Sequence, residues 1–230
     1  MWGFITTYLN SVSNSGFNFV PVFLGAIILW NFLIRVQQGT ILGFFEDVWS
    51  RNFLNLFASP LTVGEYITGL VLTCMVTSAA GLVVMLVLAG LAFGFLLLQF
   101  GSLLIPFILI LFLFGLALGV FTAGVVLRFG PSAEWLAWPV PFLLAPFAGV
   151  FYPVAVLPAS MQFVSKLVPA SYVFENMRNF ISGSPVDMTG LIVGIVLSLM
   201  YLMLSYHFFV RIYRRALRSG LLTHFGGEEG

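Results

Sequence analysis

Charged residues are scarce in this sequence and unevenly placed. Asp, Glu, Lys and Arg make up 7% of the 230 residues, against about 25% in an ordinary soluble domain. None of them occurs between Glu65 and Arg128. As one helix rising about 1.5 Å per residue, that interval would be roughly three times as long as the hydrocarbon core of a bilayer, about 30 Å, is thick. The sequence therefore predicts an integral membrane protein whose uncharged interval crosses the bilayer more than once.

Other absences exclude whole classes of function. The single cysteine, Cys74, rules out a disulfide framework and a cysteine-rich zinc site. The histidines, His207 and His224, belong to no His-Glu-x-x-His pattern, and the sequence has no Gly-x-Ser-x-Gly elbow and no phosphate-binding Gly-x-x-x-x-Gly-Lys-[Ser/Thr] loop. We therefore expect no catalytic residue, no metal site and no cofactor bound by this chain. The net charge of +1 argues against binding to nucleic acid.

The apolar runs divide the chain into five full crossings and one partial crossing. Arg35, Gln37 and Gln38 are expected to close the first full crossing, and the polar residues from Gln99 to Ser102 divide the long uncharged interval. The predicted spans are about 17–36, 65–96, 103–127, 135–151 and 188–210, with residues 1–10 forming part of a further span. The predicted fold is thus all-α, a single domain over 1–230 with about six transmembrane helices.

Prolines predict irregular helices in the last third of the chain. Pro139, Pro141 and Pro146 each remove a backbone donor, so the 135–151 span is expected to be broken or widened. Residues 152–187 are too polar to span the bilayer once and too apolar for a free loop. Short interfacial or re-entrant helices are expected there.

The distribution of arginine predicts the orientation. Arg211, Arg214, Arg215 and Arg218 follow the last span, and cytoplasmic loops carry an excess of Lys and Arg. If this tail, 211–230, is cytoplasmic, every other Lys and Arg is also inside except Lys166 and Arg178. Residues 43–64 then form a cytoplasmic loop and 152–187 an external one.

The cytoplasmic loop has the character of an amphipathic helix. Val48, Phe53, Leu56 and Phe57 approximate one helical stripe, and Ser59-Pro60 stops it. Such a helix lies on the inner membrane surface or docks its apolar face into a partner's groove. These residues alone leave both interpretations open.

Several segments together resemble a known family. They are Phe23-Leu-Gly25 with Leu29-Trp30, then Phe45-Glu-Asp-Val-Trp-Ser-Arg-Asn-Phe-Leu-Asn-Leu-Phe-Ala-Ser-Pro-Leu61 with Glu65 and Gly69, and the external Tyr152-Pro153, Leu157-Pro158 and Pro169-Ala-Ser-Tyr-Val-Phe-Glu-Asn-Met-Arg178. In order and spacing, they resemble the permease subunits of type 2 ATP-binding-cassette (ABC) exporters from about Phe17 to Tyr213.

The resemblance implies partners and a set of site residues. A coupling helix would rest on a separate ATPase subunit through Glu46, Asp47, Trp49, Arg51, Asn52, Asn55, Ser59 and Pro60. External helices would cap the translocation path with Tyr152, Pro153, Pro158, Pro169, Tyr172, Glu175 and Arg178 as gate residues. Two copies of the chain would pair above two ATPases, which bind the ATP and magnesium, in a bacterial cytoplasmic (inner) membrane.

The expected function is ATP-driven export of an amphipathic or lipid-like substrate. The uncharged, Phe-rich spans suit such a substrate better than an ion, although Phe at helical spacing also serves for packing and lipid contact. Gly115 and Gly119 form a small-residue packing motif, and Glu175 and Arg178 are spaced for a salt bridge. The alternatives are a structural or assembly subunit of a membrane complex and an intramembrane enzyme.

Overall fold

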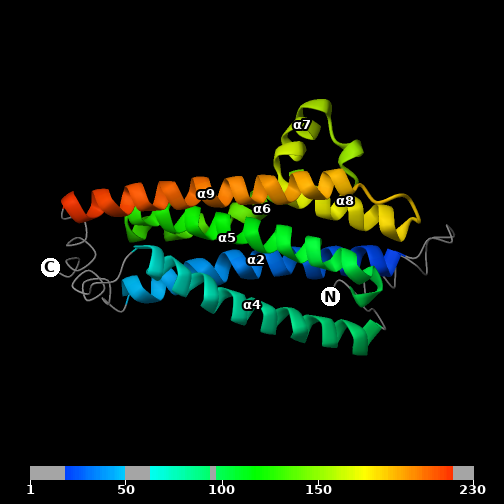
Figure 1. The fold of residues 1–230 in the computed structure, drawn as a ribbon, viewed down its shortest axis with the longest axis horizontal. Coiled ribbons are helices and arrows are strands. Elements are labelled where there is room, and N and C mark those ends of the chain that lie inside the picture. The colour runs from blue at the N-terminus through cyan, green and yellow to red at the C-terminus, as the bar shows by residue number, and fades with distance from the viewer. Residues whose placement is uncertain (1–18, 50–62, 94–96, 220–230) are drawn as a thin grey trace.

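The computed structural model describes residues 19–49, 63–93 and 97–219 (Figure 1). They form the helices α2 (Phe19–Trp49), α4 (Val63–Phe93), α5 (Leu104–Phe129), α6 (Val140–Ala148), α7 (Ala159–Leu167), α8 (Pro169–Ile181) and α9 (Met188–Ser219), and the 3₁₀ segments η1 (Leu97–Leu103), η2 (Pro131–Ala137) and η3 (Val154–Val156). The described ranges contain no strand. The all-α class is therefore confirmed, while the partial span predicted at residues 1–10 lies outside these ranges.

Within the described ranges, four stretches of helix are long and apolar enough to cross a membrane. They are Phe23–Glu46, Gly64–Leu91, Gln99–Phe129 and Met188–Arg215, and their long axes run side by side in one bundle (Figure 1). Length and composition thus support a multi-pass membrane protein. The predicted spans at 103–127 and 188–210 fall within two of these stretches, and the span at 65–96 largely coincides with a third.

The middle of the bundle is held by close contact between α5 and α2. A methyl group placed on Gly115 would lie 3.0 Å from the carbonyl oxygen of Leu33, and one on Gly119 would lie 3.0 Å from that of Gln37. Small residues let helix backbones approach this closely in membranes. The packing role predicted for Gly115 and Gly119 is confirmed, and the pairing shows that α5 and α2 run parallel.

The predicted end of the first full span is wrong. Helix α2 continues without interruption through Arg35, Gln37 and Gln38 to Trp49, so residues 43–49 are its last turns and not part of a loop. The helix tolerates the buried Gln37 because its amide nitrogen donates to the carbonyl of Ala137 at 3.0 Å. That carbonyl is open because Pro141, four residues later, has no N–H to give it.

The span predicted at 135–151 is broken, as its prolines indicated. A turn at Trp138-Pro139 separates η2 from α6, whose nine residues make it too short to cross a bilayer alone. The predicted tail also needs correction, because α9 continues to Ser219 as one helix. Its last turns carry the arginines that were assigned to the tail.

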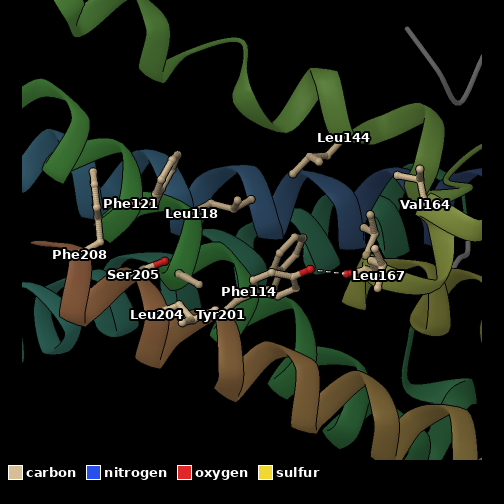
Figure 2. A pocket seen from close by; sticks show the side chains of 12 residues that line it. Phe114, Leu118, Phe121, Leu144, Val164, Leu167, Tyr201, Leu204, Ser205 and Phe208 are labelled. Carbon is tan, nitrogen blue, oxygen red and sulfur yellow. Dashed lines mark hydrogen bonds between the residues drawn. The ribbon is translucent and has the colours of Figure 1, made fainter. Parts of the chain in front are cut away.

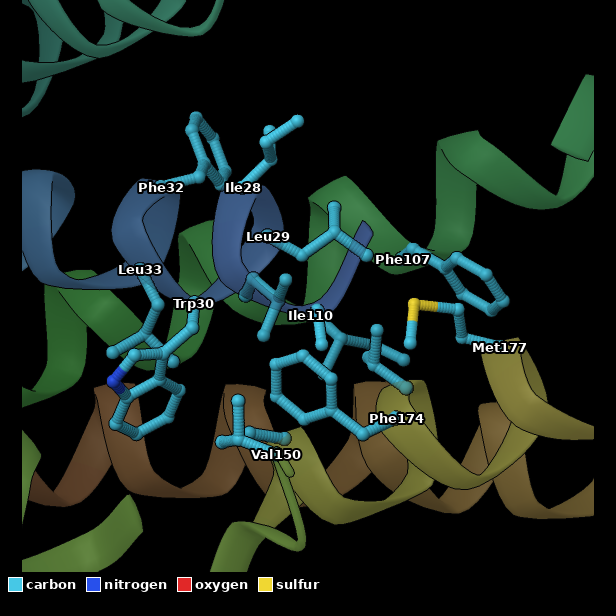
Figure 3. Close-up of a cluster of buried hydrophobic side chains, with 14 of the residues drawn as sticks. Ile28, Leu29, Trp30, Phe32, Leu33, Phe107, Ile110, Val150, Phe174 and Met177 are labelled. Atoms are coloured by element: carbon cyan, nitrogen blue, oxygen red, sulfur yellow. The ribbon is translucent and has the colours of Figure 1, made fainter. Parts of the chain in front are cut away.

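Two short helices precede α9, as predicted for residues 152–187. Helix α7 stands out from the bundle, whereas α8 lies along one end of it (Figure 1). Phe174 and Met177 of α8 are fully buried against α2 and α5, and the Phe174 ring lies 6.1 Å from that of Trp30 (Figure 3). Helix α8 is therefore a built part of the core at this end.

Candidate functional site

A polar stripe runs along the open face of α2. Asn31, Arg35, Gln38 and Glu46 follow one another at intervals that return to the same helical face. With Thr73 and Thr77 of α4, these residues line a groove of about 410 Å³ between the two helices. Its lining is mixed polar and apolar, which is unusual on a surface of this composition. We call it the α2–α4 groove.

Arg35 occupies the most costly position in this groove. It lies near the middle of α2 (Phe19–Trp49), about 21 Å of helical rise before the last residue of that helix. The neighbouring helices support this central position. Arg35 packs beside Gly81, near the middle of α4, and the next residue, Val36, contacts Gly115, near the middle of α5. An arginine at the centre of a transmembrane helix costs about 2.5–3.5 kcal/mol on insertion scales, so such a residue is a functional candidate by default.

The Arg35 side chain is seated but not neutralised. A methyl group on Gly81 would lie 2.6 Å from Cδ of Arg35, so the absence of a side chain there makes room for the arginine stem. Arg35 is exposed, and within the described ranges its guanidinium makes no ion pair and no hydrogen bond. Glu46 lies three helical turns further along α2, too far to neutralise it. The groove therefore presents an unpaired cation at mid-span.

Small polar residues close the floor of the groove. Thr40 donates to the carbonyl of Val36 at 2.9 Å, and the thiol of Cys74 reaches the same carbonyl at 3.1 Å. Cys74 is buried beside Gly39. Hydrogen bonds and small residues of this kind hold membrane helices together, so these groups are explained by the packing of α4 on α2.

A second polar cluster lies at the α8 end of the bundle. Arg178 donates to the carboxylate of Glu175 at 2.6 Å and to the carbonyl of Gly149 at 2.7 Å, while the same carboxylate accepts from the backbone N–H of Val154 at 2.8 Å. The ion pair predicted from the spacing is present. It ties α8 to the loop between α6 and η3, and its arginine side chain is only 15% exposed.

The other predicted gate residues lie around this cluster. The Tyr152 hydroxyl donates to the carbonyl of Pro146 and the Tyr172 hydroxyl to that of Lys166. Pro153, Pro158 and Pro169 stand at the starts of η3, α7 and α8, where a missing N–H costs nothing. Burial, and secondly the carboxylate of Asp187, raises the pKa of Tyr172. Sequence reasoning passed over Asp187, which caps α9 by accepting from the N–H of Gly190.

An apolar groove of about 530 Å³ lies on the opposite side of the bundle (Figure 2). Phe114, Leu118 and Phe121 of α5 face Tyr201, Leu204 and Phe208 of α9 across it. Leu144 of α6 and Leu167 of α7 complete the lining. Among the described residues, its polar side chains are Tyr201, whose hydroxyl donates to the carbonyl of Leu167, and Ser205. The chemistry of this groove suits a hydrocarbon chain and nothing charged.

Most of the predicted ATPase-coupling residues fall outside the described ranges. Glu46 is exposed near the end of α2, and Asp47 and Trp49 belong to the same helix. Arg51, Asn52, Asn55, Ser59 and Pro60 lie in the interval from 50 to 62, outside these ranges. The end of α2 and the start of α4, which this interval joins, lie close to each other at the same end of the bundle as the last turns of α9 (Figure 1).

Metal-ligating side chains do not cluster in the described residues. They contain no group of three His, Cys, Asp or Glu side chains that could hold a metal ion. His207 is exposed on α9, and its Nδ1 lies 2.8 Å from the carbonyl of Met203.

The sequence contained a signal for the α2–α4 groove that was interpreted differently. Arg35 and Gln38 looked like the polar end of a span, whereas their spacing from Asn31 and Glu46 also matches one face of a longer helix. Scans for relatives add nothing to this assignment, since no protein-family model matches the chain and no curated protein is similar to it.

Proposed function

We propose that this chain is the membrane-spanning permease subunit of an ABC exporter. It would work as a pair of copies with two separate ATPase subunits in a bacterial cytoplasmic membrane, and export an amphipathic or lipid-like substrate. The proposal rests on the family resemblance of Phe45–Leu61 and Pro169–Arg178, together with one structural observation. That observation is that the end of α2 and the start of α4, which flank residues 50–62, lie at the opposite end of the bundle from α8 (Figure 1).

The charges at these two ends support the orientation. Arg128 ends α5, and Arg211, Arg214 and Arg215 lie in the last turns of α9. The end of α2 and the start of α4 lie at this arginine-rich end, whereas Lys166 and Arg178 lie towards the other, with α7 and α8. Because positive charge accumulates on cytoplasmic sides, the arginine-rich end would face the cytoplasm and an ATPase there.

Helix α2 offers a direct mechanical link between an ATPase and the middle of the bundle. It runs as one helix from Phe19 to Trp49, without the break that the sequence had indicated near Gln37. A push at the coupling segment would therefore be carried to Arg35 and Asn31. ATP binding and hydrolysis would tilt the two copies and open a path between them, while α8 caps the outer end.

The decisive experiment is purification of the tagged protein in mild detergent, followed by mass spectrometry and an ATPase assay of the eluate. The proposal expects a near-stoichiometric ATPase that is lost in Arg51→Glu and retained in Lys166→Glu, the matched charge reversal at the opposite end. Recovery of intact protein without any ATPase would contradict the permease assignment. An ATPase that copurifies but is never stimulated by a transported lipid would favour an assembly subunit.

A further inference from the structure

Arg35 requires an explanation that the fold itself does not supply. Arg178 and the buried Gln37 each donate to described groups, although Nε of Arg178 and Oε1 of Gln37 are buried without a partner, whereas Arg35 has no partner at all within the described ranges. Long cationic side chains near the ends of a span snorkel to the interface, whereas Arg35 lies near the middle of α2. A partner that reaches the groove would compensate its charge there.

We propose that the α2–α4 groove binds the anionic head group of an amphipathic substrate, with Arg35 as the residue that carries the charge recognition. This inference rests on the proposed function, because it names the chemical class of the exported substrate. The head group that fits best is a phosphate or phosphate ester. A planar guanidinium offers two parallel N–H donors to such an oxyanion.

The neighbouring side chains support an anion as the occupant. Gln38, one turn from Arg35, donates no hydrogen bond within the described ranges, so its amide is available to a ligand. Thr73 lines the same groove. Among the described lining residues the only carboxylate is that of Glu46, at the far end of the stripe. A cation would therefore meet Arg35 without a compensating charge, whereas an anion would meet two side chains that can donate to it.

The surface beside the groove supports an apolar tail on the same ligand. Thr73, Thr77, Gly81, Val84 and Leu88 recur on one face of α4 at intervals of three and four residues. The threonines line the groove, Gly81 seats Arg35, and Val84 and Leu88 are exposed at 57% and 60%. This face thus changes from polar to apolar beyond Arg35. A head group at Arg35 would leave its hydrocarbon along Val84 and Leu88.

The test measures lipid binding to the detergent-purified chain by native mass spectrometry, without an ATPase. The probes are dilauroyl phosphatidate, dilauroyl phosphatidylcholine and inorganic phosphate. Phosphatidate should bind the wild type at least about tenfold more tightly than phosphatidylcholine does, and Arg35→Gln should weaken phosphatidate by about tenfold. Lys166→Gln, which removes an exposed cation elsewhere, should bind phosphatidate like the wild type. Inorganic phosphate alone should bind weakly, because it lacks the tail.

A second pair of variants keeps Arg35 and changes the glycine surface against which an arginine side chain can pack. A methyl group on Gly81 would lie 2.6 Å from Cδ of Arg35, whereas one on Gly69, in the same helix, would meet nothing within 4 Å. Gly81→Val should therefore weaken the binding of phosphatidate, and Gly69→Val should leave it unchanged. Both variants must retain the thermal transition of the wild type, so that a change in binding is not a change in folding.

Several results would overturn the inference. Equal binding of phosphatidate and phosphatidylcholine, or no loss in Arg35→Gln, would show that the groove does not recognise an anionic head group. Absence of phosphatidate binding, with Arg35→Gln splitting a dimer on light scattering, would assign the groove to contact with a second copy. If inorganic phosphate binds as tightly as phosphatidate, the groove recognises the phosphate alone and the apolar tail plays no part in binding. Each of these results leaves the ATPase pull-down, and with it the proposed function, unaffected.

Discussion

Two arginines of this protein occupy opposite electrostatic situations. Arg178 is 15% exposed and is held by the Glu175 carboxylate and the Gly149 carbonyl, whereas Arg35 is exposed at the centre of a membrane-length helix without an ion pair in the described ranges. Each arginine lies against a glycine, Gly149 and Gly81 respectively. Arg178 thus contributes contacts that hold the fold together, whereas Arg35 makes no polar contact that stabilises the described part of the fold.

The comparison teaches how charge in a membrane protein can be interpreted. A buried ion pair leaves a large cost when one partner is removed, because the other is stranded. An unpaired arginine can be removed without stranding anything. Replacing Arg178 should therefore lower stability more than replacing Arg35 does. Replacing Arg35 should weaken phosphatidate binding more than replacing Arg178 does.

The largest effect is expected for Arg178→Leu. This change leaves the half-exposed Glu175 carboxylate with the Val154 N–H as its remaining described partner and leaves the Gly149 carbonyl without its Arg178 donor. Since hydrogen bonds to charged groups contribute about 1.5–3 kcal/mol each and these are partly solvated, we expect a loss of about 3 kcal/mol in the free energy of unfolding. Thermal unfolding in detergent measures it, with Lys166→Leu as the control. An unchanged thermal transition would show that the ion pair does not contribute to stability.

The next effect is expected for Gly149→Ala, which tests the seat of Arg178. Gly149 has a φ of +62°, and an added methyl group would lie 2.9 Å from Cγ2 of Val154 and 3.3 Å from Nη2 of Arg178. A left-handed conformation alone costs a non-glycine residue about 1–2 kcal/mol. Gly183→Ala is the control, because Gly183 also has a positive φ, of +71°, but an added methyl group there would meet nothing within 4 Å. It therefore introduces the backbone strain without the side-chain clashes. Gly149→Ala should lower the thermal transition further than Gly183→Ala, and equal losses would argue against close packing at Arg178.

A small effect is expected for Arg35→Leu, in contrast to Arg178→Leu. No described group loses a partner, and exposed substitutions usually change stability by no more than about 0.5 kcal/mol. The thermal transition in detergent should therefore match that of the wild type. A loss as large as that of Arg178→Leu would mean that Arg35 is structural, and would end the comparison on which the groove assignment depends.

The smallest effect concerns pH at the external cluster. Burial and Asp187 raise the pKa of Tyr172 in the folded protein, so the stability linked to its protonated phenol is present below the ordinary pKa of about 10 and is lost as pH rises through the raised value. Tyr172→Phe cannot ionise. The difference in melting temperature between wild type and Tyr172→Phe should be constant below about pH 9 and should narrow above pH 10. A constant difference across this range would contradict the shift.

The sequence by itself determined the class of the molecule and the identity of its helices. The uncharged interval from Tyr66 to Leu127 admits only membrane-length helices, because unpaired backbone groups are too costly in hydrocarbon. The prolines around Pro139 marked the broken segment, and the spacing of Glu175 and Arg178 marked their ion pair. All three are local features, set by neighbours along the chain.

Only the tertiary structure decided where α2 ends and what its polar residues do. Gln37 remains within the helix because Ala137, a hundred residues away, offers a carbonyl that Pro141 leaves open. Arg35 became a mid-span residue through its seat on Gly81 and the parallel packing of α5. A polar residue at a predicted span end and one in a groove look alike in sequence, because the partner that distinguishes them comes from a distant part of the chain.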